Sequence, residues 1–239
     1  MKKLNILFYV IIAVCLLIAI YIVCDNFLMK KEDIANNFNE SDEIELLNNK
    51  LSKVGSPLGW IIIVDGINNQ DNGKYKVTYD KNLLDNYSYR QLFTMEYILS
   101  FNNNYDKFIV LDMDGKEVDD LPTSDFTTAY ISYDEFNNYY KSLFGKDFDN
   151  SKAKKGNTKN DKDYVYYENR RAGSNGVYVS MIQTDNVKYE DGIYISNVII
   201  TYSTRASELI GVSTDTAVLK YTKDIDGNIN FKSFTLKDR

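Results

Sequence analysis

The chain has 239 residues, and its 28 Lys and Arg against 34 Asp and Glu give a formal net charge of −6. An acidic balance argues against general nucleic-acid binding, which needs a basic face. The chain has no histidine, and its two cysteines are Cys15 and Cys24, so residues 25–239 hold no Ser-His-Asp triad, Cys-His dyad, histidine zinc site or disulfide.

Residues 4–24 form an uncharged apolar run, LNILFYVIIAVCLLIAIYIVC, directly after Lys2 and Lys3. As an α-helix this run covers about 32 Å, close to the ~30 Å hydrocarbon core of a bilayer. We therefore expect a transmembrane helix at 4–24, which contacts the lipid bilayer. Because positive residues stay on the cytoplasmic side, residues 1–3 are expected in the cytoplasm and residues from about 25 onward outside, as in a single-pass signal-anchor.

Two other fates of this run stay open. A cleaved signal peptide has an apolar region of about 7–15 residues and a small-x-small cleavage site, and the residues before Cys24 are not small. A lipoprotein would be processed at Cys24, but its signal has a small residue directly before the cysteine, where this chain has Val23. The sequence favours a retained anchor in the cell membrane.

Residues 25–56 are polar and are expected to form a linker with one amphipathic helix at 42–54. Acidic residues gather in the first turn of this helix, and its apolar residues recur at helical spacing, namely Ile44, Leu47, Leu51 and Val54. We expect Gly55-Ser56-Pro57 to end the helix. Residues 57–239 are expected to form one extracytoplasmic α+β domain.

The start of this domain has two short segments with strand character. Residues 60–66 form a run rich in β-branched side chains that closes with Asp-Gly, and residues 74–79 alternate between polar and apolar side chains. These patterns predict two paired strands. We expect Trp60 to fill the core.

Two further elements follow. The spacing of apolar residues predicts a helix at 87–101. The apolar run at 108–111 predicts a strand, and Asp114-Gly115 predicts the turn after it.

The clearest local signal is a helix between Ser132 and Gly145. Ser132 and Glu135 have the spacing of a capping box, and Gly145 is suited to a left-handed C-terminal cap. The expected buried stripe consists of Phe136, Tyr140, Leu143 and Phe144. Residues 146–163 are polar and rich in lysine, and we expect a solvated loop there.

From residue 164 onward the pattern predicts an antiparallel sheet. The expected strands lie at 164–167, 177–182, 187–189, 193–202, 216–222 and 229–236. In the last strand Ile229 and Phe231 share one face, whereas Phe234 and Leu236 are out of phase with them. One extra residue would bring all four to the same face, so we predict a β-bulge near 232–233.

No pattern assigns a catalytic, cofactor-binding or metal-binding residue. The acidic clusters at 112–120 and 224–228 offer oxygen ligands for Ca²⁺, but neither has the EF-hand spacing, and hairpin turns explain both. A pair of carboxylates for glycosidase-like hydrolysis is conceivable, but spacing alone selects no pair among 34 acids. We expect Gly211 to lie in a loop.

The anchor, the SYDEFNNYYKSLFG helix at 132–145 and the strands after it together resemble small membrane-anchored proteins of low-GC Gram-positive bacteria. Helices followed by a curled sheet over residues 85–239 are similar to NTF2-like or cystatin-like domains. This resemblance implies ligand binding between sheet and helix, or association through the sheet face. The VirB8-like components of conjugation machines also share the single pass and the orientation. No catalytic residue is carried over, since no motif matches.

The first hypothesis is therefore a non-catalytic binding or scaffolding protein of the cell envelope. Its expected partners are the bilayer, through residues 4–24, and an envelope protein or wall component, with no nucleic acid and no cofactor. The alternatives are an envelope hydrolase that uses paired carboxylates and a VirB8-like component of a secretion or conjugation assembly. Two facing carboxylates in a concave pocket would favour the hydrolase.

Overall fold

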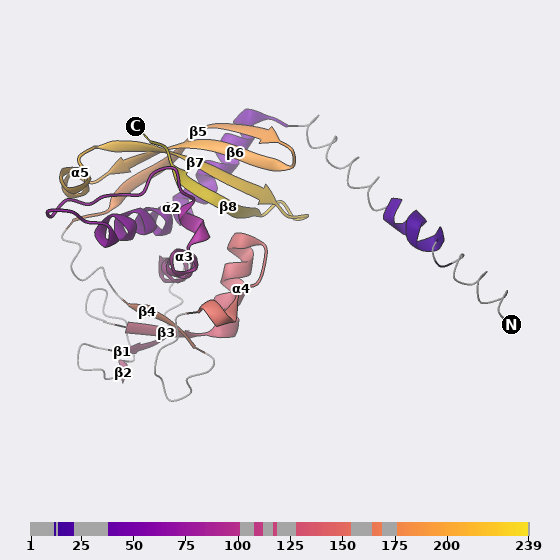
Figure 1. The fold of residues 1–239 in the computed structure, drawn as a ribbon, viewed down its shortest axis with the longest axis horizontal. Helices are drawn as coiled ribbons and strands as arrows, with labels where there is room; N and C mark the ends of the chain where they lie inside the picture. The colour runs from indigo at the N-terminus through magenta and orange to yellow at the C-terminus, as the bar shows by residue number, and fades with distance from the viewer. Residues whose placement is uncertain are drawn as a thin grey trace.

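The computed structural model describes residues 12, 14–21, 38–100, 108–111, 117–118, 128–153, 164–168 and 176–238. Within these residues the chain forms an α+β fold with two antiparallel four-stranded sheets (Figure 1). The predicted fold class, α+β with antiparallel pairing, is confirmed at this level.

Residues 14–21 of the apolar run are helical, and their side chains are exposed. Among the described residues, no helix is both long and apolar enough to cross a membrane. Most of the predicted transmembrane segment 4–24 lies outside the described residues.

The helices and strands run in the following order: α2 (Glu40–Asn68), η1 (Leu83–Asp85), α3 (Tyr87–Ser100), β1 (Phe108–Leu111), β2 (Glu117–Val118), β3 (Thr128–Ser132), α4 (Tyr133–Phe144), η3 (Asn150–Lys152), β4 (Tyr164–Glu168), β5 (Val179–Glu190), β6 (Ile193–Tyr202), α5 (Thr204–Ile210), β7 (Thr214–Lys223) and β8 (Ile229–Leu236). The smaller sheet has the strand order β2-β1-β3-β4, and the larger sheet has β5-β6-β7-β8. The predicted helix at 87–101 and the strands at 108–111 and 164–167 are confirmed as α3, β1 and β4.

Helix α2 corrects two predictions. The helix does not end at 55–57 but continues through Pro57 to Asn68, so residues 60–66 are helical and form no strand. Residues 74–79 form no regular strand either, and contribute only isolated bridges. The run at 60–66 is buried all round, and a continuously buried apolar helix has no polar side that would distinguish it from a buried strand. The expected boundary at 56/57 lies inside α2.

The larger sheet is a meander whose two predicted segments 177–182 and 187–189 join into one long strand, β5, with register shifts. The predicted β-bulge is confirmed in β8. Lys220 pairs with Ser233 and Tyr221 pairs with Phe231, so Lys232 is the extra residue. The bulge lets Ile229, Phe231, Phe234 and Leu236 all face the core, where each is buried.

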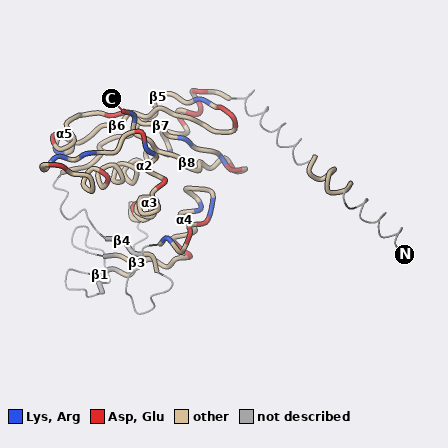
Figure 2. The backbone as a smooth tube through the Cα atoms, in the orientation of Figure 1, with Lys and Arg blue, Asp and Glu red and all other residues tan. Residues whose placement is uncertain are grey.

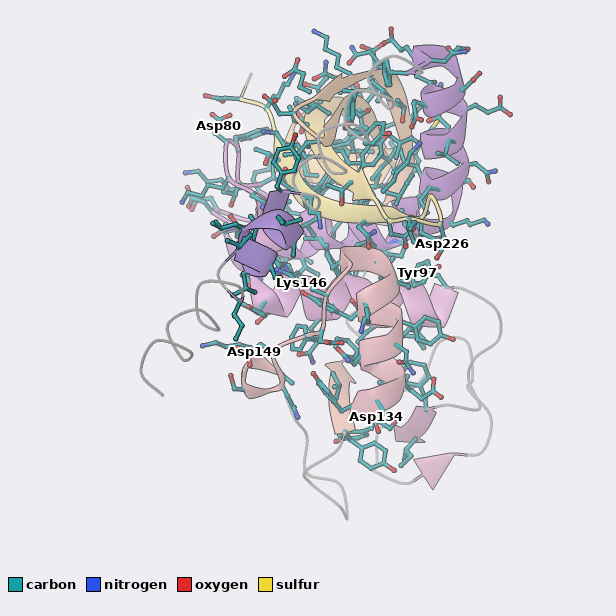
Figure 3. The ribbon with its side chains drawn as sticks, turned by 90° about the vertical axis from the view of Figure 1, so that its right-hand side faces the viewer. Asp80, Tyr97, Asp134, Lys146, Asp149 and Asp226 are labelled. Carbon is teal, nitrogen blue, oxygen red and sulfur yellow. The ribbon has the colours of Figure 1, made fainter. Side chains whose placement is uncertain are left out.

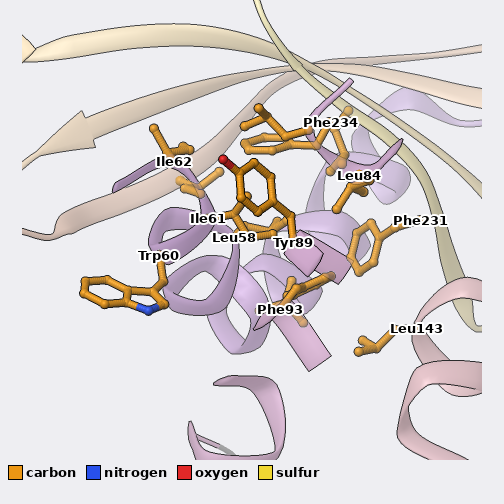
Figure 4. Packing of buried hydrophobic residues seen from close by; sticks show 14 of the residues in the cluster. Leu58, Trp60, Ile61, Ile62, Leu84, Tyr89, Phe93, Leu143, Phe231 and Phe234 are labelled. Carbon is orange, nitrogen blue, oxygen red and sulfur yellow. The ribbon is translucent and has the colours of Figure 1, made fainter. Parts of the chain in front are cut away.

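The main core lies between the larger sheet and helices α2 and α3, which cover one of its faces (Figures 1 and 4). Phe93 of α3 packs against Phe231 of β8 and Phe144 of α4, with ring centroids 5.8 and 5.7 Å apart. Trp60 is 6 % exposed, as predicted for a core residue. The core therefore joins both halves of the chain.

Helix α4 lies between the two sheets and begins and ends as predicted. The Ser132 hydroxyl accepts a hydrogen bond from the Glu135 amide, and Gly145 closes the helix with φ of 69°. The prediction of a solvated loop at 146–163 is wrong at the start of this range, because Phe148 is buried and packs edge-on against Phe136 and Tyr140. Residues 154–163 of that loop lie outside the described residues.

Helix α5 corrects the expected loop around Gly211. Ser203 caps the helix by accepting a hydrogen bond from the Ala206 amide, and Gly211 ends it in the left-handed conformation. The helix has only seven residues, too few for a hydrophobic period to be visible in the sequence.

Candidate functional site

Exposed carboxylates are spread over the molecule. Asp80, Asp134, Asp149 and Asp226 project from different parts of the fold (Figure 3). Within the described residues, no three acidic or cysteine side chains group in a way that would hold a metal ion. Most of the candidate calcium segment 112–120 lies outside the described residues.

The second candidate calcium segment, 224–228, forms the turn of the β7–β8 hairpin. The Asp224 carboxylate accepts hydrogen bonds from the backbone amides of Asp226 and Asn228, at 3.0 and 2.8 Å. Hydrogen bonds from Asn228, first from its side chain, lower the pKa of Asp224. The carboxylate of Asp224, which a bound cation would need as a ligand, therefore already accepts hydrogen bonds within the turn. This geometry supports the interpretation of 224–228 as a hairpin turn.

Three carboxylates are buried in the described part of the chain, those of Asp65, Glu96 and Asp215. Tyrosine hydroxyls donate to Asp65 and to Asp215. Asp65 of α2, 4 % exposed, accepts from the Tyr89 hydroxyl at 3.0 Å and from the Thr78 amide at 2.6 Å. Asp215 of β7 accepts from the hydroxyls of Tyr79 and Tyr202 at 3.1 and 3.0 Å. Since these contacts fix residues 78–79 against α2 and the sheet, they stabilise the fold.

A partly buried ion pair joins the first turn of α2 to the end of β7. The Lys223 ammonium contacts the Glu43 carboxylate, with side chains only 17 % and 14 % exposed. The same ammonium lies 4.8 Å from the centre of the Tyr194 ring, which stacks on Tyr221. Phe38 stacks on Tyr189 beside them. This cluster attaches the start of the domain to the sheet.

Both edges of the larger sheet are covered by side chains. On edge strand β5, the amides of Thr184 and Val187 donate to Asn48 and Glu40 of α2. On edge strand β8, the Phe234 amide donates to Asn82 at 2.9 Å. Capped edges disfavour the addition of a strand from another chain.

The face of the larger sheet opposite α2 and α3 has no element packed on it within the described part of the chain (Figure 1). We call this the open face. Asn230 pairs with Thr222 on this side of the sheet but is buried next to Gly145. Strand alternation and register also assign this face the following residues, which are all exposed or half-buried: Met181, Gln183, Asn186, Lys188, Ile193, Ile195, Asn197, Ile199, Thr201, Thr214, Thr216, Val218, Lys220, Thr222, Ser233 and Thr235. Aliphatic side chains form patches among amides, hydroxyls and lysines.

The open face is the candidate binding surface, and only part of it could be predicted from the sequence. The alternation of β7 places Thr216, Lys220 and Thr222 on a face of their own. In β6, isoleucines point both ways: Ile200 is buried, whereas Ile199 is 38 % exposed. An apolar residue on the solvent side removes the alternation that would identify the outer face.

No protein-family model, no curated protein and no solved structure matches this chain.

Proposed function

We propose that the protein is a single-pass membrane protein whose extracytoplasmic α+β domain binds an envelope partner and does not catalyse a reaction. The apolar run at 4–24 after Lys2 and Lys3 carries the location and the orientation. The open face of the larger sheet supports the binding role, because the other face and both edges are occupied by the chain itself.

A carboxylate-dependent hydrolase has less support in the described residues. Such an enzyme needs two facing carboxyl groups, of which one has a raised pKa. Of the three buried carboxylates among the described residues, Asp65 and Asp215 accept hydrogen bonds from tyrosines, and Glu96 lies in α3. Hydrogen bonds lower the pKa values of the carboxyl groups of Asp147, Asp149 and Asp224, and neighbouring lysines lower those of Asp147 and Asp149 further.

The finer fold assignment also remains a proposal. Helices on one face of a curled antiparallel sheet are compatible with an NTF2-like or cystatin-like domain. A VirB8-like role in a secretion or conjugation assembly would use the same orientation and would place the open face against another component. That other component of the assembly would then be the envelope partner that the open face binds.

Site-directed photo-crosslinking in living cells tests the proposal. A crosslinker at Thr216, on the open face, is expected to capture a specific envelope partner. The matched control is the exposed Asn138 of α4, which is expected to capture no such partner. Equal capture from both positions, or none at Thr216 together with cleavage of wall glycan by the purified protein, would refute the proposal.

A further inference from the structure

We infer that the open face binds an extended polyanion that carries phosphate groups, an inference that rests on the proposed binding function. Three lysines, Lys188, Lys220 and Lys237, lie on or reach over this face. None of them forms an ion pair with a carboxylate in the described part of the chain. The whole chain has six more acidic than basic residues, so three lysines without a carboxylate partner among the described residues, on one sheet face, differ from the charge of the rest of the molecule. Figure 2 marks where basic and acidic residues lie along the backbone.

The sheet register places Lys188 and Lys220 near each other, and a side-chain hydrogen bond brings Lys237 to the same area. Lys188 pairs with Ile195, which pairs with Lys220, so the two lysines flank one isoleucine. Their Cα atoms are therefore about 10 Å apart, two strand spacings. Lys237 follows β8, and its Nζ donates to Asn197 Oδ1 at 2.6 Å. Asn197 lies two residues along from Ile195, about 7 Å away.

A line of amides continues the polar path across the face. Asn197 Nδ2 donates to Asn186 Oδ1 at 3.0 Å, and Asn186 Nδ2 donates to Asp185 Oδ2 at 3.1 Å. The carboxylates of this region lie at the margins of the face. Asp185 and Glu190 belong to edge strand β5, Asp191 lies in the turn after it, and Asp238 follows Lys237, with its amide donating to Asp80 Oδ1. The centre of the face is therefore positive, and an elongated anion can lie along it.

The residue types favour phosphate over carboxylate and over nucleobases. The positive groups are lysines, which bind phosphate as compact charges, whereas planar carboxylates are recognised in pairs of hydrogen bonds by arginine. The assigned residues of the face include no aromatic ring, and binding of single-stranded nucleic acid depends on stacking of bases on such rings. A phosphate polymer without bases fits this surface.

The binding experiment uses the full chain in detergent micelles and fluorescently labelled inorganic polyphosphate, followed by anisotropy. With about 0.7 released counterions per contacted phosphate, three contacts predict an affinity loss of about 20-fold between 50 and 200 mM NaCl. The triple variant K188Q/K220Q/K237Q is expected to bind about tenfold more weakly, since exposed ion pairs contribute modestly each. The control K141Q/K146Q/K152Q removes the same charge from the α4 side and is expected to bind within about twofold of the native chain.

Three results would overturn the inference: equal weakening by both triple variants, native affinity of the K188Q/K220Q/K237Q variant, or competition by poly-L-glutamate as strong as by polyphosphate. Circular dichroism of each variant confirms folding, and K220E alone serves if the triple variant does not fold. If polyphosphate fails to bind while the Thr216 crosslinker still captures an envelope partner, this inference falls and the proposed function stands.

Discussion

Two glycines in the same helix should respond to alanine in opposite directions. Gly55 and Gly59 both lie inside α2. A Cβ added at Gly55 would lie 3.9 Å from Ile182 Cβ, an ordinary contact, whereas at Gly59 it would lie 2.6 Å from Val179 Cβ. Because Val179 Cβ is fixed to its backbone, no change of rotamer relieves this overlap, and α2 would have to move away from β5.

The magnitudes follow from these distances. Alanine in a helix interior is favoured over glycine by about 0.8–1 kcal/mol, so Gly55→Ala should stabilise the domain by about that amount. At Gly59 the same gain is opposed by an overpacking cost of about 2–3 kcal/mol, the upper part of the usual range, because the 2.6 Å overlap with Val179 Cβ has no rotamer that relieves it. Gly59→Ala should therefore destabilise the domain by about 1–2 kcal/mol. The difference between the variants is about 2–3 kcal/mol.

Urea unfolding of the full chain in detergent micelles measures both variants. The single tryptophan, Trp60, is buried in α2 and reports unfolding by its fluorescence. The two midpoints should move in opposite directions from the native value. A Gly55→Ala variant that is destabilised, or a Gly59→Ala variant as stable as the native chain, would refute the continuous helix and its close approach to β5.

Three further predictions concern buried polar groups. Lys223→Met should cost about 1–3 kcal/mol by leaving the partly buried Glu43 without its partner, and adding Glu43→Leu should restore most of that loss in a double-mutant cycle of urea unfolding. Asp65→Ala should cost about 3 kcal/mol, because two buried donors lose their acceptor; a midpoint unchanged by this variant contradicts the structural role. Burial, with Glu43 nearby, raises the pKa of Tyr194 to about 12. The folded state thus keeps a proton that an unfolded tyrosine loses near pH ~10. Stability should therefore fall between about pH 10 and 12, less steeply in Tyr194→Phe, and parallel pH profiles of both proteins would exclude this cause.

Local signals were sufficient wherever caps and periodicity agree. Helix α4 has a serine cap, a buried stripe and a glycine stop, and each is present in the structure. The bulge at Lys232 could be predicted because an apolar strand residue that faces solvent loses the free energy of burial. One extra residue in the strand turns such side chains back to the core face. These features depend on neighbours in the sequence.

The wrong predictions concern segments whose conformation depends on contacts with residues far away in the sequence. Pro57 suggested a helix end, yet α2 continues because residues 58–64 are buried on all sides, so packing outweighs the loss of one backbone hydrogen bond. Phe148 lies in a polar segment, and it is buried because it packs against rings of α4 such as Tyr140. The sequence of the polar segment alone does not indicate these contacts. The open face depends on which side of the sheet the distant helix α2 covers.

We propose that the folded domain lies outside the membrane and that residues 4–24 hold it there. Cysteine labelling in intact cells tests it directly, with Cys15 and Cys24 first replaced by alanine. A single cysteine at exposed Thr216 should react with a membrane-impermeant maleimide without permeabilisation. Labelling only after lysis of the cells would contradict the orientation and the proposed function together.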